Sequence, residues 1–89
     1  MTDTVRCHVY RANRKAETYL YLRENEPEES LPEELRRLLG HLDLVMDLEL
    51  HSNRTLARED VNKVMENLRS KGWHLQMPPL PETFKNFQT

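Results

Sequence analysis

The stretch from residue 42 to residue 50 constrains the fold most, because apolar and polar side chains alternate along it. The apolar positions are Leu42, Leu44, Met46, Leu48 and Leu50. The positions between them are Asp43, Val45, Asp47 and Glu49. Successive side chains of a strand point to opposite faces, so this spacing predicts five apolar groups on one face and three carboxylates on the other. We therefore expect a sheet with one apolar face and one polar face.

The length and the charge of the chain limit its class. Its 89 residues suffice for a single domain, residues 1–89, whose core buries roughly 60 to 65% of the unfolded surface. The net charge of -2 gives no general affinity for nucleic acid. Residues 1–23 carry five basic and two acidic groups, whereas residues 24–50 carry two basic and nine acidic groups. The sequence therefore predicts a dipolar surface.

Cys7 is the only cysteine, so no intrachain disulfide can form. Free cysteines are commonly buried, and we expect Cys7 to be a small core residue. The start of the chain lacks the basic and then apolar pattern of a signal peptide, and no apolar run approaches the ~20 residues of a membrane span. These features predict a cytoplasmic protein that does not associate with membranes.

The first part of the chain predicts a β-hairpin and a polar loop. Val5, Cys7 and Val9 alternate with polar residues, and a second β-rich run follows at residues 18–22. Residues 24–29 are too polar to pack, so we expect them to form a solvated loop.

Two helices are predicted from apolar spacing and end signals. Ser30 with Glu33 three residues later matches a capping box, and Gly40 suits the end of this helix. The apolar positions of the first helix are Leu31, Leu35, Leu38 and Leu39. Those of the second are Val61, Val64, Met65 and Leu68, at the i, i+3, i+4, i+7 spacing of one helix face. Gly72 suits the end of the second helix.

A last strand and a short tail complete the expected elements. Residues 73–77 alternate between apolar and polar side chains, and the proline-rich residues 78–81 stop the strand. These prolines favour a stiff connector over a polyproline ligand for another protein. Phe84 and Phe87 predict one helical turn in the tail, residues 83–89.

The element order is β-β-α-β-α-β with a short C-terminal helical tail, which predicts an α+β fold with a mainly antiparallel sheet. The domain core is expected over about residues 5–82. Both helices are expected to cover the apolar face of the sheet. The polar face is expected to carry the acids Asp43, Asp47 and Glu49 together with His8, Tyr10, Tyr19, Tyr21, His74 and Gln76.

Three blocks of the chain form a recognisable pattern. The blocks are Cys7-His8-Val9-Tyr10-Arg11, Thr18-Tyr19-Leu20-Tyr21 and Leu75-Gln76-Met77-Pro78-Pro79-Leu80-Pro81-Glu82. From Cys7 to Glu82 the chain resembles the YcgL family, small bacterial proteins with a single domain of unknown function. The resemblance implies an α/β/α sandwich with helical material on both sheet faces. It implies no activity, cofactor or catalytic residue.

The polar face offers two candidate chemistries. His8 and His74 are expected on the same face as the acids, and two histidines with a carboxylate can bind a divalent transition metal. No HExxH or CxxC motif fixes such a geometry. At ~3.3 Å per residue, Asp47 and Glu49 would lie roughly 6 to 7 Å apart, which matches an inverting glycosidase in distance only. We favour solvation, or pairing with nearby Arg and Lys, and predict no enzyme, no cofactor and no metal site.

The hairpin carries the candidate interaction surface. Its residues are Arg6, Arg11, Arg14, Lys15, Tyr19, Tyr21 and Arg23. Basic and aromatic groups together are typical of surfaces that bind single-stranded RNA, but the acids of residues 42–50 would repel phosphates if that strand neighboured the hairpin. The leading hypothesis is a non-enzymatic module that binds another protein and takes no small-molecule substrate. The alternative is an RNA-binding accessory module that uses the hairpin.

Overall fold

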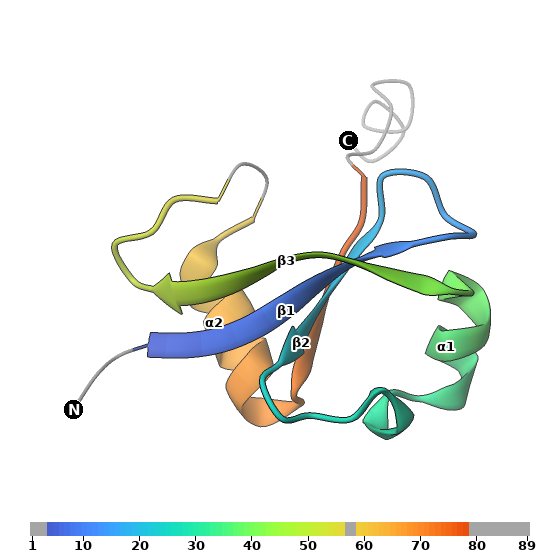
Figure 1. The fold of residues 1–89 in the computed structure, drawn as a ribbon. Helices are drawn as coiled ribbons and strands as arrows, with labels where there is room; N and C mark the ends of the chain where they lie inside the picture. Colours follow the sequence, from blue (N-terminus) through green and yellow to red (C-terminus); the bar gives the residue numbers. More distant parts are fainter. Residues whose placement is uncertain (1–3, 57–58, 79–89) are drawn as a thin grey trace, which may run out of the picture.

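A computed structural model of the chain describes residues 4–56 and 59–78, which form four strands and two α-helices (Figure 1). The strands are β1 (Thr4–Ala12), β2 (Tyr19–Arg23), β3 (Leu42–His51) and β4 (Trp73–Gln76). The helices are α1 (Glu33–Leu39) and α2 (Val61–Ser70), and a short 3-10 helix (Glu28–Ser30) precedes α1. This order confirms the predicted α+β fold, while the predicted helical tail at residues 83–89 lies outside the described residues.

The four strands form one antiparallel sheet in the order β3-β1-β2-β4. Strands β1 and β2 are central, so β3 and β4 form the two edges. The register of the hairpin sets Cys7 opposite Arg23 and Arg11 opposite Tyr19. Each pair of directly opposite residues shares a face of the sheet, so the register decides which side chains meet.

The pairing of β1 with β3 contains a bulge at Val45. Val9 pairs with Met46 and Tyr10 pairs with Leu44, so Val45 has no partner on β1. Because paired residues share a face, Leu44 lies on the face of Tyr10, and Met46 lies on the opposite face. The prediction that the five apolar residues of β3 share one face is therefore wrong, since one extra residue breaks the two-residue period.

Each face of the sheet has its own apolar core. The core beneath α2 consists of the buried residues Val5, Cys7, Val9, Tyr21, Leu50, Val61, Val64, Met65 and Leu68. The core beneath α1 consists of Ala12, Leu20, Leu22, Leu31 and Leu39. The helices therefore cover opposite faces, named here the α2 face and the α1 face. This confirms the α/β/α sandwich and corrects the expectation that both helices cover one face.

The reason for two cores is visible in β2. Leu20, Tyr21 and Leu22 are consecutive and all buried, at 0%, 6% and 2% exposure. Consecutive strand residues point to opposite faces, so this strand needs cover on both sides.

The polar residues expected on one face are divided between the two. His8 pairs with Leu22 and lies on the α1 face, whereas Tyr21 pairs with His74 on the α2 face. The expectation that His8 and His74 share a face is therefore wrong, because the register sets His8 on the face of Leu22 and Trp73, and His74 follows Trp73 along β4.

The first helix begins later than predicted. Its N-cap is Pro32, whose fixed φ suits the start of a helix. Ser30 instead ends the 3-10 helix, and its Oγ donates a hydrogen bond to the carbonyl of Pro27 at 2.7 Å. The predicted capping box between Ser30 and Glu33 is therefore wrong.

The second helix has strong signals at both ends. Asp60 is its N-cap and accepts a hydrogen bond from the Asn62 N–H at 3.0 Å. Gly72 follows the helix with φ at +91°, a conformation that favours glycine, and a Cβ there would lie 2.9 Å from Glu26 Cδ. Glu26 also pairs with Arg23 at 2.9 Å, so the polar loop is anchored to the domain at this point.

Two leucines of β3 provide a test of the bulge. Leu50 is 0% exposed, whereas Leu44 is 59% exposed. Leu50→Ala is expected to lower the free energy of unfolding by about 2 to 5 kcal/mol, because it leaves a cavity in the core. Leu44→Ala is expected to change it by less than about 0.5 kcal/mol. Urea unfolding followed by Trp73 fluorescence measures both, and equal large losses would place both leucines in the core and contradict the bulge.

Candidate functional site

The candidate interaction residues divide between the two ends of the hairpin. Antiparallel pairing brings Arg6 of β1 close to Arg23 of β2 at the open end. The residues around the turn end are Arg11, Arg14, Lys15 and Tyr19. The structure therefore does not join all of them into one continuous surface.

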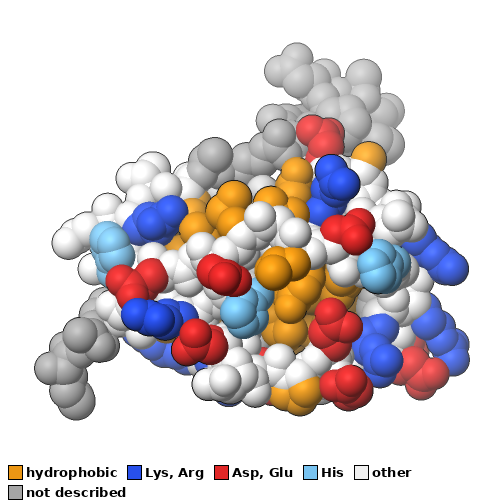
Figure 2. Space-filling model, viewed as in Figure 1, with side chains coloured by type: hydrophobic (Ala, Val, Ile, Leu, Met, Phe, Trp, Pro, Cys, Tyr) orange, Lys and Arg blue, Asp and Glu red, His pale blue; other side chains and the backbone are white. Residues whose placement is uncertain are grey.

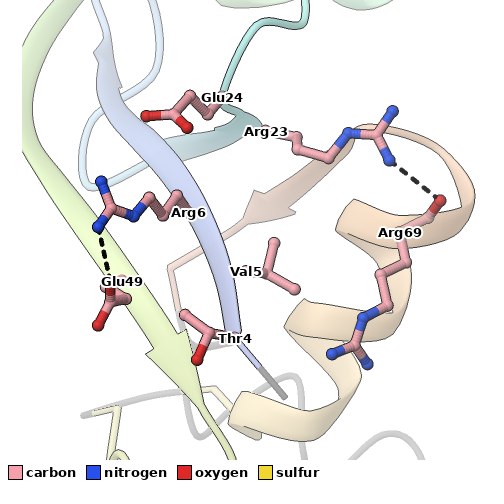
Figure 3. A pocket seen from close by; sticks show the side chains of 7 residues that line it. All are labelled: Thr4, Val5, Arg6, Arg23, Glu24, Glu49 and Arg69. Atoms are coloured by element: carbon pink, nitrogen blue, oxygen red, sulfur yellow. Dashed lines mark hydrogen bonds and ion pairs between the residues drawn. The ribbon is translucent and has the colours of Figure 1, made fainter. Parts of the chain in front are cut away.

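The open end of the hairpin forms a shallow hollow of about 570 Å³ (Figure 3). Its charged lining residues are Arg6, Arg23, Glu24, Glu49 and Arg69. Arg6 pairs with Glu49 at 3.2 Å, and Arg23 donates hydrogen bonds to the carbonyl of Arg69 at 3.3 Å and to Glu26 at 2.9 Å. In Figure 3 the guanidinium groups of Arg6 and Arg23 point away from one another, toward these partners. This internal pairing leaves the hollow with little excess positive charge.

The turn end gathers basic groups from two elements. The backbone N–H of Arg14 donates to the carbonyl of Leu39 at 3.1 Å, and its Nη1 donates to the carbonyl of Arg37 at 3.3 Å. These bonds bring Arg36 and Arg37 of α1 to the same end as Lys15, and Figure 2 shows Lys and Arg side chains gathered there. The sequence did not place the two α1 arginines, because no local pattern indicates that the hairpin turn meets the end of α1.

The hairpin tyrosines differ in their access to solvent. Tyr21 is 6% exposed, and its hydroxyl donates a hydrogen bond to Gln76 Oε1 at 2.7 Å. Burial, together with the Glu59 carboxylate, raises the pKa of Tyr21. Its ring belongs to the core and cannot stack on a base, whereas Tyr19 is half-buried on the same face.

Exposed apolar side chains gather on β3. Leu44, Val45 and Met46 are 59%, 46% and 48% exposed, and we name these three residues the β3 strip. Figure 2 shows hydrophobic side chains reaching the surface in the middle of the molecule, between acidic side chains. Leu44 lies on the α1 face and Met46 on the α2 face, so the β3 strip reaches both faces of the edge strand. The sequence alone assigned Leu44 and Met46 to the core, and no residue near Val45 signals the bulge.

The acids of β3 are paired with neighbouring bases. The pairs are His8–Asp47, Arg6–Glu49 and His41–Asp43, with N to O distances of 2.5, 3.2 and 3.1 Å. The sequence favoured solvation or pairing with Arg and Lys for these acids, and among these pairs only Arg6–Glu49 is of that kind. Exposed pairs of this kind contribute about 0 to 1 kcal/mol each to the free energy of unfolding. They therefore affect the surface charge more than the stability of the domain.

The two histidines considered for a metal occupy separate sites. His74 lies between Glu59 at 2.8 Å and Asn67 at 2.9 Å on the α2 face, and its ring packs edge-on against Tyr21. His8 pairs with Asp47 on the other face. Within residues 4–56 and 59–78, no group of three His, Cys, Asp or Glu residues is arranged to hold a metal ion. Neither helix in these ranges has the length and apolar character needed to cross a membrane.

Cys7 is a buried core residue, as predicted. It is 2% exposed, and burial raises the pKa of its thiol to about 11, although the charge of Arg54 acts in the opposite direction. The thiolate, which is the nucleophilic form, is therefore scarce at neutral pH.

Comparison with known proteins gives a consistent match. The family model described as the YcgL domain matches residues 7–79. The chain is similar to a YcgL domain-containing protein of Pseudomonas putida, with 46% identity over 88% of this chain and 80% of that protein. A relative in Pseudomonas aeruginosa is 47% identical over the same shares. A relative in Thioalkalivibrio sulfidiphilus is 41% identical over 84% of this chain and 93% of that protein.

The raised pKa of Cys7 predicts a loss of stability at alkaline pH. Its ordinary value is 9.0 and its folded value is about 11, so the folded state binds the thiol proton more tightly. This contribution is complete below the unfolded pKa and is lost as the pH rises through the folded pKa. Between pH 9.0 and about pH 11, the free energy of unfolding of the wild-type chain should therefore fall relative to that of Cys7→Ala. The tyrosines titrate in both chains, so their contribution cancels in this difference. A difference that stays constant with pH would contradict the prediction.

Proposed function

The chain belongs to the YcgL domain family, whose name states no activity, and we propose that this member is a cytoplasmic protein-binding module that uses β3 as a docking edge. The observation that carries the proposal is the exposure of the β3 strip at the edge of the sheet. The domain acts without catalysis and takes no small molecule as substrate. Its partner is an extended segment of another protein that adds to the sheet as a further strand.

The β3 strip lies where a partner strand can pair. Among the described residues, β3 has a strand neighbour on one side only, which is β1. The backbone N–H and C=O groups along the outer side of such a strand are a template for another chain. Hydrogen bonds to these groups would supply affinity that does not depend on the partner's sequence.

The bulge adds a preference for apolar side chains. Because Leu44 and Met46 lie on opposite faces, the alternating side chains of a partner strand would meet an apolar group on each face. Covering these side chains gains roughly 25 cal/mol for each Å² of apolar surface removed from water. We therefore expect the partner segment to have an apolar centre.

Acids flank the β3 strip and favour a basic partner. Asp43 precedes it, and Asp47 and Glu49 follow it, with side chains 49%, 71% and 53% exposed. Lys or Arg residues beside the apolar centre of the partner would complement these charges. A second copy of β3 would instead bring acids of the same kind against these flanks, and like charges destabilise a strand pair.

The RNA-binding alternative has less support from the geometry. Arg6 and Arg23 are paired at the open end of the hairpin, and Tyr21 is buried in the core. The basic residues that remain at the turn end are Arg11, Arg14, Lys15 and Arg36, because Arg37 pairs with Glu33 at 2.7 Å. The half-buried tyrosines Tyr10 and Tyr19 are left for stacking on a base, and they lie on opposite faces of the sheet. We therefore keep RNA binding as the alternative function, and the experiment below includes a direct test of it.

Selection from random peptides displayed on phage tests the docking edge. The immobilised full-length protein should enrich peptides with an apolar centre flanked by Lys or Arg. Leu44→Glu is expected to weaken the binding of these peptides at least about tenfold, equivalent to ~1.4 kcal/mol. Leu38→Glu is the matched control, because it makes the same change at a leucine of α1 that is 43% exposed. Isothermal titration of synthetic peptides measures the affinities.

Three outcomes would count against the proposal. Equal peptide affinity for Leu44→Glu and Leu38→Glu would show that β3 is not the docking edge. A dimer in sedimentation that Leu44→Glu abolishes would assign the edge to a second copy of the chain. Labelled single-stranded RNA that binds at low salt, and is released by Arg11→Glu with Arg14→Glu, would favour the RNA-binding module.

A further inference from the structure

Two of the three acids that flank the β3 strip have a histidine as their partner. His8 Nδ1 lies 2.5 Å from Asp47 Oδ1, and His41 Nε2 lies 3.1 Å from Asp43 Oδ1. The third acid pairs with an arginine, whose charge does not change near neutral pH. The net charge of the flanks therefore depends on the protonation of two histidines.

His8 can take up a proton without leaving Asp47. In the neutral ring, Nδ1 donates its proton to the carboxylate, and the acid keeps its negative charge. Within residues 4–56 and 59–78, Nε2 of His8 has no hydrogen-bond partner, and the side chain is 34% exposed, so water can deliver a proton to Nε2. Histidine ordinarily gains this proton between about pH 8 and pH 5. The protonated pair then carries no net charge.

The groups around His8 are mostly acidic. They line a hollow of about 390 Å³ or contact the ring of His8 edge-on. These titratable and charged groups are Arg6 and Tyr10 of β1, Asp47 and Glu49 of β3, and Glu24, which follows β2. On β2 itself, the residue opposite His8 is the uncharged Leu22. Three carboxylates and one arginine thus make this flank the more acidic one, and a proton on His8 removes part of its negative charge.

The groups around His41 are more basic. They are Asp43 of β3, Glu28 of the 3-10 helix, Arg36 of α1, Arg11 opposite Asp43 on β1, and Arg14, whose side chain lies against Gly40. Three arginines outnumber two acids here. This flank therefore attracts a basic segment less than the flank at Asp47 does, and His41 has the smaller part in any change of charge.

From these pairs we infer that a fall in pH releases basic partner segments from β3, mainly through protonation of His8 and to a smaller extent of His41. This regulation rests on the docking edge proposed above. A lysine beside the β3 strip is attracted by an ionised Asp47, but not by a neutral pair of Asp47 with protonated His8. The proton and the basic segment compete for the same acid, so each lowers the affinity for the other. Affinity is therefore complete above the titration of the histidines and is lost as the pH falls through it.

Isothermal titration of the full-length protein at about pH 7.5 and about pH 5.5 tests the inference. The probe is a peptide from the phage selection that has Lys flanks, blocked ends and no His, Asp or Glu, so its own charge stays constant in this range. Its affinity for the wild-type protein should fall about threefold to tenfold at the lower pH, as expected for the loss of one or two exposed charge pairs. The same peptide with each Lys changed to Gln should keep its affinity to within about twofold.

Histidine variants separate the two pairs from general effects of acid. In His8→Gln the side chain can still donate to Asp47 but never becomes charged, so the Lys peptide should keep most of its affinity at the lower pH. Adding His41→Gln should remove the remaining dependence on pH. His51→Gln, the same change at the last residue of β3, is the matched control and should show the wild-type dependence. Trp73 fluorescence at both pH values checks that each variant is folded.

Each other result would overturn the inference. Equal affinity of the Lys peptide at both pH values would leave the docking edge in place without control by pH. An equal loss for the Lys and Gln peptides would mean that the charge of the flanks is not the cause. A loss that persists in the double His variant, or that disappears in His51→Gln, would assign the effect to other groups. Binding of neither peptide at either pH would overturn the docking edge and this regulation together, so the two failures can be distinguished.

Discussion

The pairing of β1 with β3 is the constraint on which the other features of the molecule depend. The single unpaired residue, Val45, turns Leu44 to one face and Met46 to the other. A regular strand would place both on one face, and its other side would carry Val45 among the acids Asp43, Asp47 and Glu49. The bulge thus creates the apolar strip at the edge.

Much of the fold follows from local sequence signals. The spacing of Val61, Val64, Met65 and Leu68 predicted α2, and all four residues are buried. The bulge could not be predicted in the same way. Val45 is an apolar residue at a polar position of the alternation, but such a residue does not by itself indicate an extra residue in the strand, and no glycine lies beside it. Its position is set by long-range pairing with Val9 and Tyr10, which no window of the sequence contains.

The candidate site shows the same division between local and long-range information. The basic residues of the hairpin were identifiable from the sequence, and an antiparallel hairpin necessarily separates Arg6 and Arg23 from the residues near its turn. The partners of these basic residues could not be identified from the sequence. Glu49 is 43 positions from Arg6 and Arg37 is 23 positions from Arg14, and only the folded sheet brings them together. Glu49 therefore neutralises the charge of Arg6, whereas the Arg37 carbonyl only positions Arg14 and leaves its positive charge at the turn end.

The charges around β3 influence which partner segments can bind to this edge strand. Bulges and charged side chains are the usual means by which proteins protect an exposed edge strand from other chains, and β3 has both. Yet the centre of the edge is apolar, and its flanks stay negative because only Glu49 of the three acids pairs with an arginine. Affinity for a partner would then come from backbone pairing and the β3 strip, while the acidic flanks would guide the approach of basic segments and weaken pairing with acidic ones. An edge of this kind resists association with itself and still accepts a strand of complementary charge.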